Sequence, residues 1–396
     1  MTETACYILD NGAYTAKVGH SSEEPKIIPN CIMKAKSERR RPFIGNQIED
    51  CRDASGLYYL LPFQKGFILN FDTQKTVWDY IFSKECCPVN FNETPLIVTE
   101  PLFNFSSIQE AMTEIFFEEY ECQSLLRINA TDLAAHNYMK SNPTAQSCVV
   151  VDSGYSYTYI VPYIKRKRVK EAIVRIDVGG KVLTNHLKEI ISYRQLNVMD
   201  ETYVINQVKE DACFVAQEFW KTMLMTKKKG KTFNPIIKDY VLPDYTTIRR
   251  GYLRDPLKTL DEIDQQTLRL NNERITVPEA LFHPSDIGIN QMGIPEAIGH
   301  AINLCPEESR PGLYANIVLY GGNTLFPGFR DRVYSEVKSD AFDHFTVEIS
   351  LGKNPITYAW EGGKLLFRDP DFYSLCMTKE EYEEEGKALA FERFDI

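Results

Sequence analysis

Two apolar stretches of the chain end in the same kind of polar turn. Residues 7–9 are apolar and lead into Asp-Asn-Gly at 10–12, and residues 149–151 lead into Asp-Ser-Gly at 152–154. Such a run is typical of a buried strand, and small polar residues with glycine after it are typical of a tight turn. Glycine lets a turn expose N–H groups that bind phosphate, and an Asp beside it can hold a hydrated divalent cation. One such turn is usually only a hairpin, but two predict related half-domains that face one phosphate-bearing ligand.

The rest of the pattern alternates between strand and helix spacing, as expected for an α/β protein. Besides the first hairpin within 5–30, it predicts strands at 96–98 and 317–320 and helices at 107–116, 183–191, 208–219 and 378–396. The helix at 107–116 opens on a Ser-Ile-Gln-Glu sequence that fits a capping box. Its apolar stripe predicts core packing rather than a site.

Glycine pairs stand beside two of these elements. Gly179-Gly180 precede the helix at 183–191, and Gly321-Gly322 follow the strand at 317–320. A glycine pair directly after a core strand allows the backbone to pack against a flat ligand such as adenine.

Composition excludes some classes of function. The net charge of −10 argues against bulk affinity for nucleic acid, although local basic patches remain compatible with it. No stretch approaches the ~20 apolar residues of a membrane span, so no membrane partner is expected. The ten cysteines lack Cys-x-x-Cys spacing, which favours free, mostly buried thiols over a zinc site.

Basic residues cluster in three places, where they can face water, a partner protein, an import receptor or DNA. The clusters are Lys34, Lys36, Arg39, Arg40 and Arg41; Lys165, Arg166, Lys167, Arg168 and Lys170; and Lys227, Lys228, Lys229 and Lys231. A further lysine, Lys17, stands on the strand that returns from the first turn. It is either a solvated strand residue or, as we favour from the adjacent turn, a counter-charge for phosphate.

At these residues the sequence resembles actin and the actin-related proteins, over essentially its whole length. The first turn resembles the phosphate-1 loop of the family, residues 151–154 the phosphate-2 loop, and residues 319–327 the adenosine motif. Residues 277–285 and 360–363 match structural landmarks of the family. Residues 183–194, 199–210 and 328–337, together with the ending Phe394-Asp395-Ile396, resemble one nuclear subfamily of these proteins.

The resemblance implies an actin-like α/β fold, in which two duplicated RNase-H-like domains flank a central nucleotide cleft and each carries a smaller subdomain. The first domain is expected to comprise residues 1–142 and 357–396, with 31–66 as its small subdomain. The second is expected at 143–356, with a small subdomain at 179–288 that has an insertion near 249–267.

The resemblance also implies ATP or ADP with magnesium in the cleft. Residue by residue, it assigns phosphate contacts to Asn11, Gly12, Ala13 and Tyr14, with Lys17 beside them. The opposing loop is Asp152, Ser153, Gly154, Tyr155 and Ser156. Lys209 and Glu210 would lie near the ribose and base, and the adenosine would be lined by Gly321, Gly322, Asn323, Leu325 and Phe326. Asp10 and Asp152 would hold the metal through its water shell.

Several positions depart from the family pattern. Ala13 replaces a serine of the first loop, and Tyr155-Ser156 replace an Asp-Gly of the second. The glutamine that orients the attacking water in actin falls at Ala130, or at Asn129 with a slip of one residue, and a nearby histidine is replaced by Tyr159. Phosphoryl transfer to water needs a positioned nucleophile, so slow or absent hydrolysis is expected.

Filament contacts depart from the pattern as well. The loop that docks onto the next actin subunit is replaced by a short basic segment at 36–41, and Asp286 replaces an aromatic residue of the hydrophobic plug. A charge buried unpaired there would cost several kcal/mol per subunit. No self-filament is therefore expected.

This resemblance implies a nuclear, non-enzymatic structural subunit of a chromatin-remodelling complex that exchanges a variant histone into nucleosomes. The cytoplasm is the alternative location. The implied partners are the motor subunit, a small partner subunit and nucleosomal DNA, the last through basic loops such as Lys165, Arg166, Lys167 and Arg168. The alternatives are a slow ATPase of the actin-like superfamily and a cytoskeletal filament component.

Overall fold

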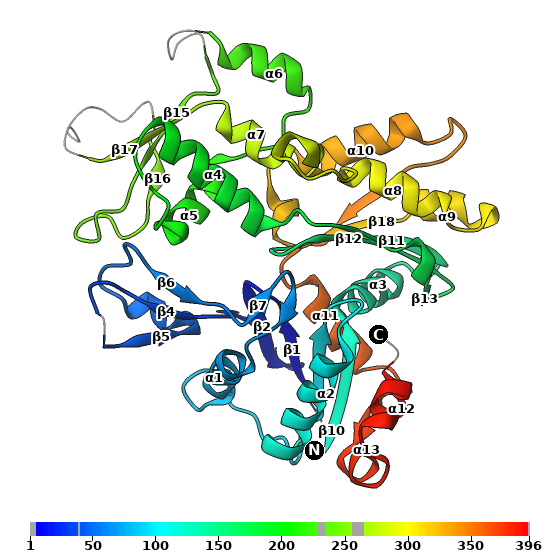
Figure 1. Ribbon diagram of the computed structural model, residues 1–396. Helices are drawn as coiled ribbons and strands as arrows, with labels where there is room; N and C mark the ends of the chain where they lie inside the picture. Colours follow the sequence, from blue (N-terminus) through cyan, green and yellow to red (C-terminus); the bar gives the residue numbers. More distant parts are fainter. Residues whose placement is uncertain (1–4, 39, 229–233, 256–264, 395–396) are drawn as a thin grey trace.

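The computed structural model describes residues 5–38, 40–228, 234–255 and 265–394. Two six-stranded sheets form the centres of two domains, and helices cover them (Figure 1). The expected α/β class and two-domain actin-like arrangement are confirmed.

The first sheet has the strand order β20-β10-β9-β1-β2-β3. Its strands are β1 (Tyr7–Asn11), β2 (Thr15–His20), β3 (Lys26–Pro29), β9 (Leu96–Glu100), β10 (Ser124–Asn129) and β20 (Met377–Thr378). β1 runs antiparallel to β2 and parallel to β9. Two tryptophans, Trp78 and Trp360, lie fully buried in the core of this domain.

The second sheet repeats this pattern, with the order β13-β12-β11-β18-β19 and β14 paired to β12. Its strands are β11 (Ser147–Ser153), β12 (Thr158–Ile164), β13 (Lys167–Arg168), β14 (Val174–Ile176), β18 (Ile317–Tyr320) and β19 (Ile349–Leu351). β11 runs antiparallel to β12 and parallel to β18, as β1 does to β2 and β9. The prediction of duplicated half-domains from the two turns is thus confirmed.

The two hairpins match residue for residue. Asp10 stands opposite Lys17 in the β1–β2 pair, and Asp152 stands opposite Tyr159 in the β11–β12 pair. The turn that joins each pair therefore has the same length, and the two aspartates occupy equivalent positions at the strand ends.

The end of the chain returns to the first domain. β20 pairs with β10, and helix α11 (Tyr358–Leu366) packs against α3 (Ala130–Ser141). Gly362 allows this close packing, since a Cβ there would lie 2.0 Å from the backbone oxygen of Leu133.

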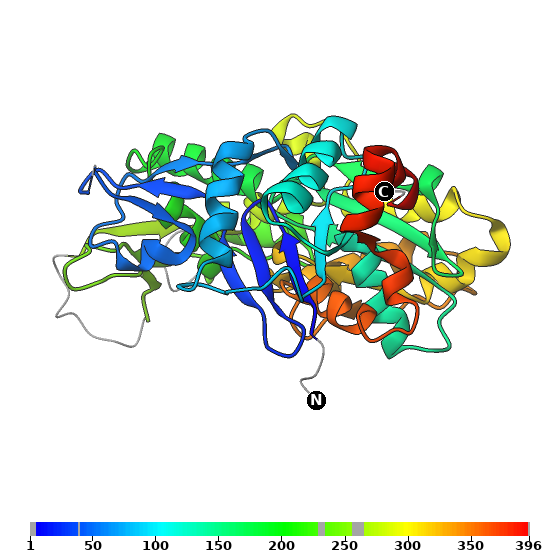
Figure 2. The same ribbon diagram turned by 90° about the horizontal axis from the view of Figure 1, so that it is seen from below.

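Each domain carries a small sheet at the same end of the molecule (Figures 1 and 2). The small sheet of the first domain comprises β4 (Ile32–Lys34), β5 (Pro42–Ile44) and β6 (Tyr58–Leu60). The small sheet of the second domain comprises β15 (Lys238–Val241), β16 (Tyr252–Leu253) and β17 (Thr267–Leu270). The subdomains touch: the Gly56 N–H donates to the Glu201 carboxylate at 3.0 Å, and Lys36 pairs with Asp200 at 3.4 Å.

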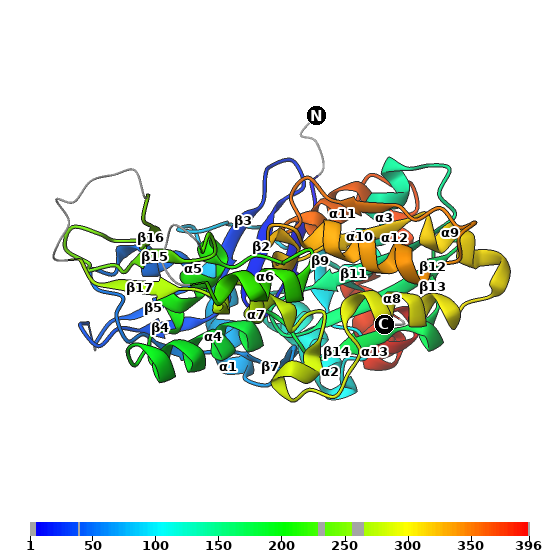
Figure 3. The ribbon, with the colours of Figure 1, turned by 90° about the horizontal axis from the view of Figure 1, so that it is seen from above.

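The remaining helices lie outside the sheets, and α5 (Thr202–Ala212) packs against the small sheet of the second domain (Figure 3). They are α1 (Phe71–Phe82), α2 (Ser106–Glu114), α4 (Gly180–Arg194), α5, α6 (Phe219–Thr226), α7 (Glu273–Glu279), α8 (Ile294–Asn303), α9 (Arg310–Tyr314), α10 (Phe329–Asp340), α12 (Phe372–Leu375) and α13 (Lys379–Arg393), and a further hairpin joins β7 (Phe63–Gln64) to β8 (Phe67–Ile68). None of the described helices has the length and apolar character needed to cross a membrane.

Two expectations about helices were wrong. The predicted helix at 208–219 forms only over residues 208–212, as the end of α5. α5 stops at Ala212, because the N–H groups of Phe214 and Val215 donate to the carbonyls of Arg274 and Pro327 instead of to the preceding turn. The predicted capping box at 107–110 is also absent. α2 begins at Ser106 after an N-cap residue, Phe105, whose side chain makes no cap hydrogen bond.

Some predicted features lie outside the described residues. These are Arg39, Lys229 and Lys231 of the basic clusters, residues 256–264 of the expected insertion, and Asp395 and Ile396 of the ending.

Candidate functional site

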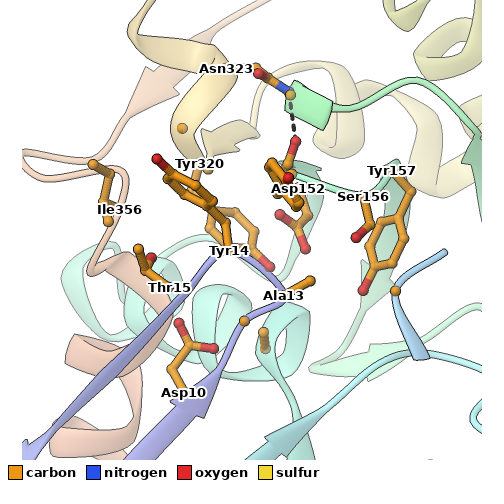
Figure 4. A pocket seen from close by; sticks show the side chains of 18 of the residues that line it. Asp10, Ala13, Tyr14, Thr15, Asp152, Ser156, Tyr157, Tyr320, Asn323 and Ile356 are labelled. Atoms are coloured by element: carbon orange, nitrogen blue, oxygen red, sulfur yellow. Dashed lines mark hydrogen bonds between the residues drawn. The ribbon is translucent and has the colours of Figure 1, made fainter. Parts of the chain in front are cut away.

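The two equivalent turns meet at one cavity of about 480 Å³ between the domains (Figure 4). From the first turn and its return strand, Asp10, Asn11, Gly12, Ala13, Tyr14 and Lys17 line it. From the second domain, Asp152, Gly154, Tyr155, Ser156, Lys209, Glu210, Gly321, Gly322, Asn323, Leu325 and Phe326 line it. Of the residues assigned to the cleft from the sequence, only Ser153 does not reach the cavity.

Asp10 in the first turn is fully partnered. Its carboxylate forms an ion pair with Lys17 at 3.0 Å and accepts a hydrogen bond from the Thr99 hydroxyl at 2.9 Å. Lys17 lies on the neighbouring strand directly opposite Asp10, so strand pairing itself brings the two charges together. The first turn thus presents a neutralised carboxylate and a cation at the edge of the cavity.

Asp152 in the second turn lacks an equivalent cation, because the position opposite it is Tyr159. Burial is the main reason that the pKa of Asp152 is raised to about 7; the hydrogen bond from the Tyr320 hydroxyl opposes this rise, the nearby Asp10 carboxylate adds to it, and Lys17 opposes it least. A divalent cation would reverse this balance by favouring the ionised form. The chemistry of Asp152 therefore suits a hydrated metal ion.

The tips of the turns expose backbone amides. The N–H of Gly12 bonds to the Asp10 carbonyl and that of Gly154 to the Tyr157 carbonyl, which closes each turn. Within the described ranges, the amides at 13–14 and 155–156 donate to no protein group. Successive unpaired amides in a turn form an anion-binding concavity, so both turns fit phosphate.

A pair of tyrosines joins the two turns across the cavity. The rings of Tyr14 and Tyr155 stack with centroids 4.8 Å apart and planes 23° apart. The Tyr14 hydroxyl also accepts a hydrogen bond from the Asn206 amide at 3.0 Å. Tyr155, one of the departures from the family pattern, thus contacts Tyr14 of the first turn, and the pair links the two domains.

The remaining lining residues form a polar wall and a glycine edge. The Lys209 ammonium is held by three oxygens, those of Gly180, Thr184 and Asn206, at 2.9–3.1 Å, and burial lowers its pKa to about 8. Lys209 therefore orders the wall formed by α4 and α5. A Cβ at Gly322 would meet no protein atom within 4 Å, so the backbone there is open to a ligand.

Ser153 and Asn323 have structural contacts. The Ser153 hydroxyl, fully buried, lies 3.0 Å from the Thr158 hydroxyl and accepts from the Asn323 amide at 3.2 Å. The same amide donates to the carbonyl of Gly154 at 2.7 Å. Ser153 therefore fixes the second turn from behind, while the strand alternation turns its side chain away from the cavity.

The position expected to orient a water molecule is apolar. Ala130 lines the cavity, whereas Asn129 is buried, with its amide donating to the Glu100 carbonyl at 2.9 Å and its oxygen accepting from Arg168. Tyr159 is also buried, and its hydroxyl is 3.4 Å from the Leu102 carbonyl. Neither of these two polar side chains lines the cavity.

The basic hairpin at 165–168 lies apart from the cavity, at the turn between β12 and β13. Lys165, Arg166 and Lys167 are exposed, while Arg168 is held 3.5 Å from the Asp132 carboxylate. Only three of the four predicted contact residues therefore present free side chains at the surface.

The lining residues that sequence reasoning did not assign to the site include Thr99, Asn206 and Tyr320. A signal existed for Thr99 and Tyr320, which end core strands beside β1 and β11, where the carboxyl ends of parallel strands gather. Asn206 has no such signal, since only the packing of α5 brings it to Tyr14.

Two duplicated domains with matched turns on one cavity define an actin-like protein. The family model described as Actin matches residues 1–395, and the chain belongs to the actin family. The family generally binds a nucleotide with magnesium.

Individual relatives narrow the resemblance to one subfamily. A Drosophila melanogaster protein named Actin-related protein 6 is 50% identical, over 96% of this chain and 98% of its own length. An Arabidopsis thaliana protein of the same name is 36% identical over 98% of each chain, and a Cryptococcus neoformans protein, Actin-like protein ARP6, is 38% identical over 98% of this chain and 84% of its own. The subfamily resembled by residues 183–194, 199–210 and 328–337 is this one, and that prediction is confirmed.

Proposed function

We propose that this chain is a nuclear structural subunit of a chromatin-remodelling complex that exchanges a variant histone into nucleosomes, and that it holds ATP or ADP with magnesium for stability with little or no hydrolysis. The single observation that supports it most is the cavity between the two turns. It combines unpaired turn amides with Asp10 and Asp152, yet Ala130 takes the place of a water-orienting side chain.

The nucleotide would be held by this chain's own groups. The amides at 13–14 and 155–156 would bind phosphate oxygens, Lys17 would add positive charge, and Asp10 and Asp152 would accept hydrogen bonds from the metal's water shell. The open backbone at Gly322 would pack against the adenosine. The magnesium would neutralise phosphate charge and keep Asp152 ionised.

Little hydrolysis follows from what surrounds the phosphate end. The lining carboxylate Glu100 is engaged with Arg127 at 3.0 Å and accepts a bond from Asn104 at 2.7 Å, so it is not free to take a proton from water. Ala130 offers no hydrogen bond to hold a water molecule in line. Bound nucleotide would then stabilise the fold by mass action without turnover.

The nucleotide part is tested with the purified full chain. Mg·ATP and Mg·ADP should each raise the melting temperature, and Asp152→Ala should abolish most of that rise. Phosphate release should stay far below the turnover of ~1 per second found in working kinases. Turnover near that rate would favour the alternative, an ATPase of the actin-like superfamily. Equal melting temperatures with and without nucleotide would count against an occupied cleft.

The chromatin part rests on the subfamily resemblance together with the exposed basic hairpin. Replacing Lys165, Arg166 and Lys167 with Glu should weaken nucleosome binding by the isolated complex. The affinity of the variant should also depend less on salt concentration than that of the wild type. Arg168 is left intact because it pairs with Asp132. Unchanged nucleosome binding and unchanged nuclear entry would assign the hairpin to the solvated surface.

The filament alternative is tested by sedimentation. The exposed Asp286 and the short β4–β5 connection at 35–41 favour a monomer. At micromolar concentration with Mg·ATP the protein should stay in the supernatant. A pellet that Asp286→Tyr enlarges would support a cytoskeletal role instead.

A further inference from the structure

Helix α6 is apolar but does not belong to either core. Five of its eight residues are apolar: Phe219, Trp220, Met223, Leu224 and Met225. Within the part of the chain that the structure describes, none of them joins a hydrophobic core cluster. Trp220 is 77% exposed and Leu224 62% exposed. Figure 1 shows α6 at the outer edge of the second domain.

Polar contacts, rather than apolar packing, hold α6 in place. At its C-terminal end the carbonyl of Thr226 accepts hydrogen bonds from the side-chain amides of Asn234 and Asn271, at 3.0 and 3.2 Å. Before its N-terminal end, the Gln217 amide donates to the Gly328 carbonyl at 2.8 Å. An eight-residue helix is marginal by itself, so these anchors keep it formed while Trp220 and Leu224 stay exposed and the other three apolar side chains are half-buried.

Of the five apolar side chains of α6, only Met225 lies on the inner face. A groove of about 550 Å³ lies beneath the helix, bordered by Lys221, Thr222 and Met225 on one side and by Pro327 and Asp331 on the other. Helical spacing places Trp220 and Leu224, four residues apart, together on the opposite face. The helix therefore presents a two-residue apolar ridge outward.

The charge beside this ridge is positive. Lys227 and Lys228 directly after the helix are exposed, whereas the nearer Lys221 is neutralised by Glu218 at 2.9 Å. The chain as a whole has a net charge of −10, so this surface is an exception to its acidic character. Charge complementarity selects an acidic partner.

We propose that Trp220 and Leu224 of α6, with Lys227 and Lys228, form a docking surface for an acidic amphipathic helix of another protein. The apolar side chains of that helix would cover the ridge, and its carboxylates would face the two lysines. Helix-on-helix recognition uses anchors at this spacing, and tryptophan is a preferred hot-spot residue. A nucleic acid would leave Leu224 in water. The proposal is independent of nucleotide binding.

The chain carries its own probe for this surface. It has three tryptophans, and Trp78 and Trp360 are 0% and 1% exposed, so exposed-tryptophan emission comes from Trp220. The full chain is titrated with a labelled 18-residue helical peptide that has leucines on one face and glutamates elsewhere. The same peptide with lysines in place of glutamates is the charge control.

The glutamate peptide should bind with a blue shift of the emission, and the lysine peptide should bind at least tenfold more weakly. Trp220→Ala or Leu224→Ala should weaken binding at least tenfold by anisotropy of the labelled peptide, and Trp220→Phe should retain most of it. Tyr373→Ala, which removes a 57% exposed ring on α12 at the other end of the molecule, should change nothing.

Four outcomes would overturn the proposal. They are equal binding of both peptides, no binding of either, binding that survives Trp220→Ala, and preferential binding of a 20-base-pair DNA duplex lost in Lys227→Glu. Concentration-dependent dimers that Trp220→Ala abolishes would instead assign the surface to a second copy of this chain. Circular dichroism of each variant confirms that the fold is retained.

Discussion

The first and second turns have the same topology but opposite electrostatics. In the first, strand pairing sets Lys17 opposite Asp10, and the two form an ion pair at 3.0 Å. In the second, the same register sets Tyr159 opposite Asp152, and the pKa of Asp152 rises to about 7. The duplicated backbone therefore fixes where the two carboxylates stand, while one residue on the returning strand decides whether the carboxylate is compensated within the protein.

The difference teaches that the two halves of the cleft have separate roles. The first turn is already neutralised, so its geometry is complete before any ligand binds. The second turn lacks its own cation and is completed by an added one. A cleft built in this way binds metal and nucleotide together, and the ligand itself becomes part of what stabilises the closed pair of domains.

The largest expected effect concerns the backbone that supports the second turn. Gly321 has a φ of 96°, and a Cβ there would lie 2.3 Å from the Ser153 carbonyl oxygen. Gly321→Ala should lower the free energy of unfolding by about 4 kcal/mol, from left-handed strain together with overpacking. Gly322→Ala is the matched control and should leave stability nearly unchanged, as measured by urea unfolding. Equal losses in both would mean that the second turn does not rest on this contact.

The ion pair of the first turn is tested next. Lys17→Met should lower the free energy of unfolding by about 3 kcal/mol, because it leaves the buried Asp10 carboxylate without its cation. The double variant Asp10→Asn with Lys17→Met should recover part of that loss. In the second hairpin, Tyr159→Phe removes two long contacts of the hydroxyl, to the Leu102 carbonyl and from Arg175, each at 3.4 Å, and should cost about 1 kcal/mol. If the Lys17 and Tyr159 variants lost equal stability, the contrast between the turns would fail.

The pH dependence of Asp152 separates the turns further. Its ordinary pKa of 3.8 is raised to about 7 in the fold, so the stability it contributes to the ligand-free protein is present below pH 3.8 and is lost as the pH rises through 7. Metal binding requires the ionised form, so Mg·ATP affinity should fall about tenfold per pH unit below 7 if one proton is released. Calorimetric titrations between pH 6 and 8 measure this slope. Asp152→Asn should flatten it, and a slope unchanged in that variant would assign the proton elsewhere.

The smallest effect concerns the link between the turns. Tyr155→Ala should remove the stack with Tyr14 and lower the free energy of unfolding by about 1 kcal/mol beyond the lost apolar area. Tyr14→Phe keeps the stack and loses only the bond from Asn206, so its cost should be smaller. A double-mutant cycle over Tyr14 and Tyr155, followed by thermal unfolding, measures the coupling. Additive single effects would show that the stack does not join the domains energetically.

The sequence by itself determined the architecture, and all but one of the residues assigned to the cleft from the sequence line the cavity. The apolar runs and the Asp-x-Gly turns are local features, and two copies of one local pattern predict two related half-domains. The family resemblance added the adenosine side, including Lys209 and Gly322, both of which line the cavity.

Only the tertiary structure decided which groups meet. It turned Ser153 away from the cavity, paired Arg168 with Asp132, and ended α5 at Ala212 through hydrogen bonds to distant carbonyls. It also set the charge state of Asp152, because burial and the approach of Asp10 across the cleft act between residues far apart in the chain. Periodicity records which side chains share a face of one element, whereas desolvation and long-range hydrogen bonds depend on how separate elements pack.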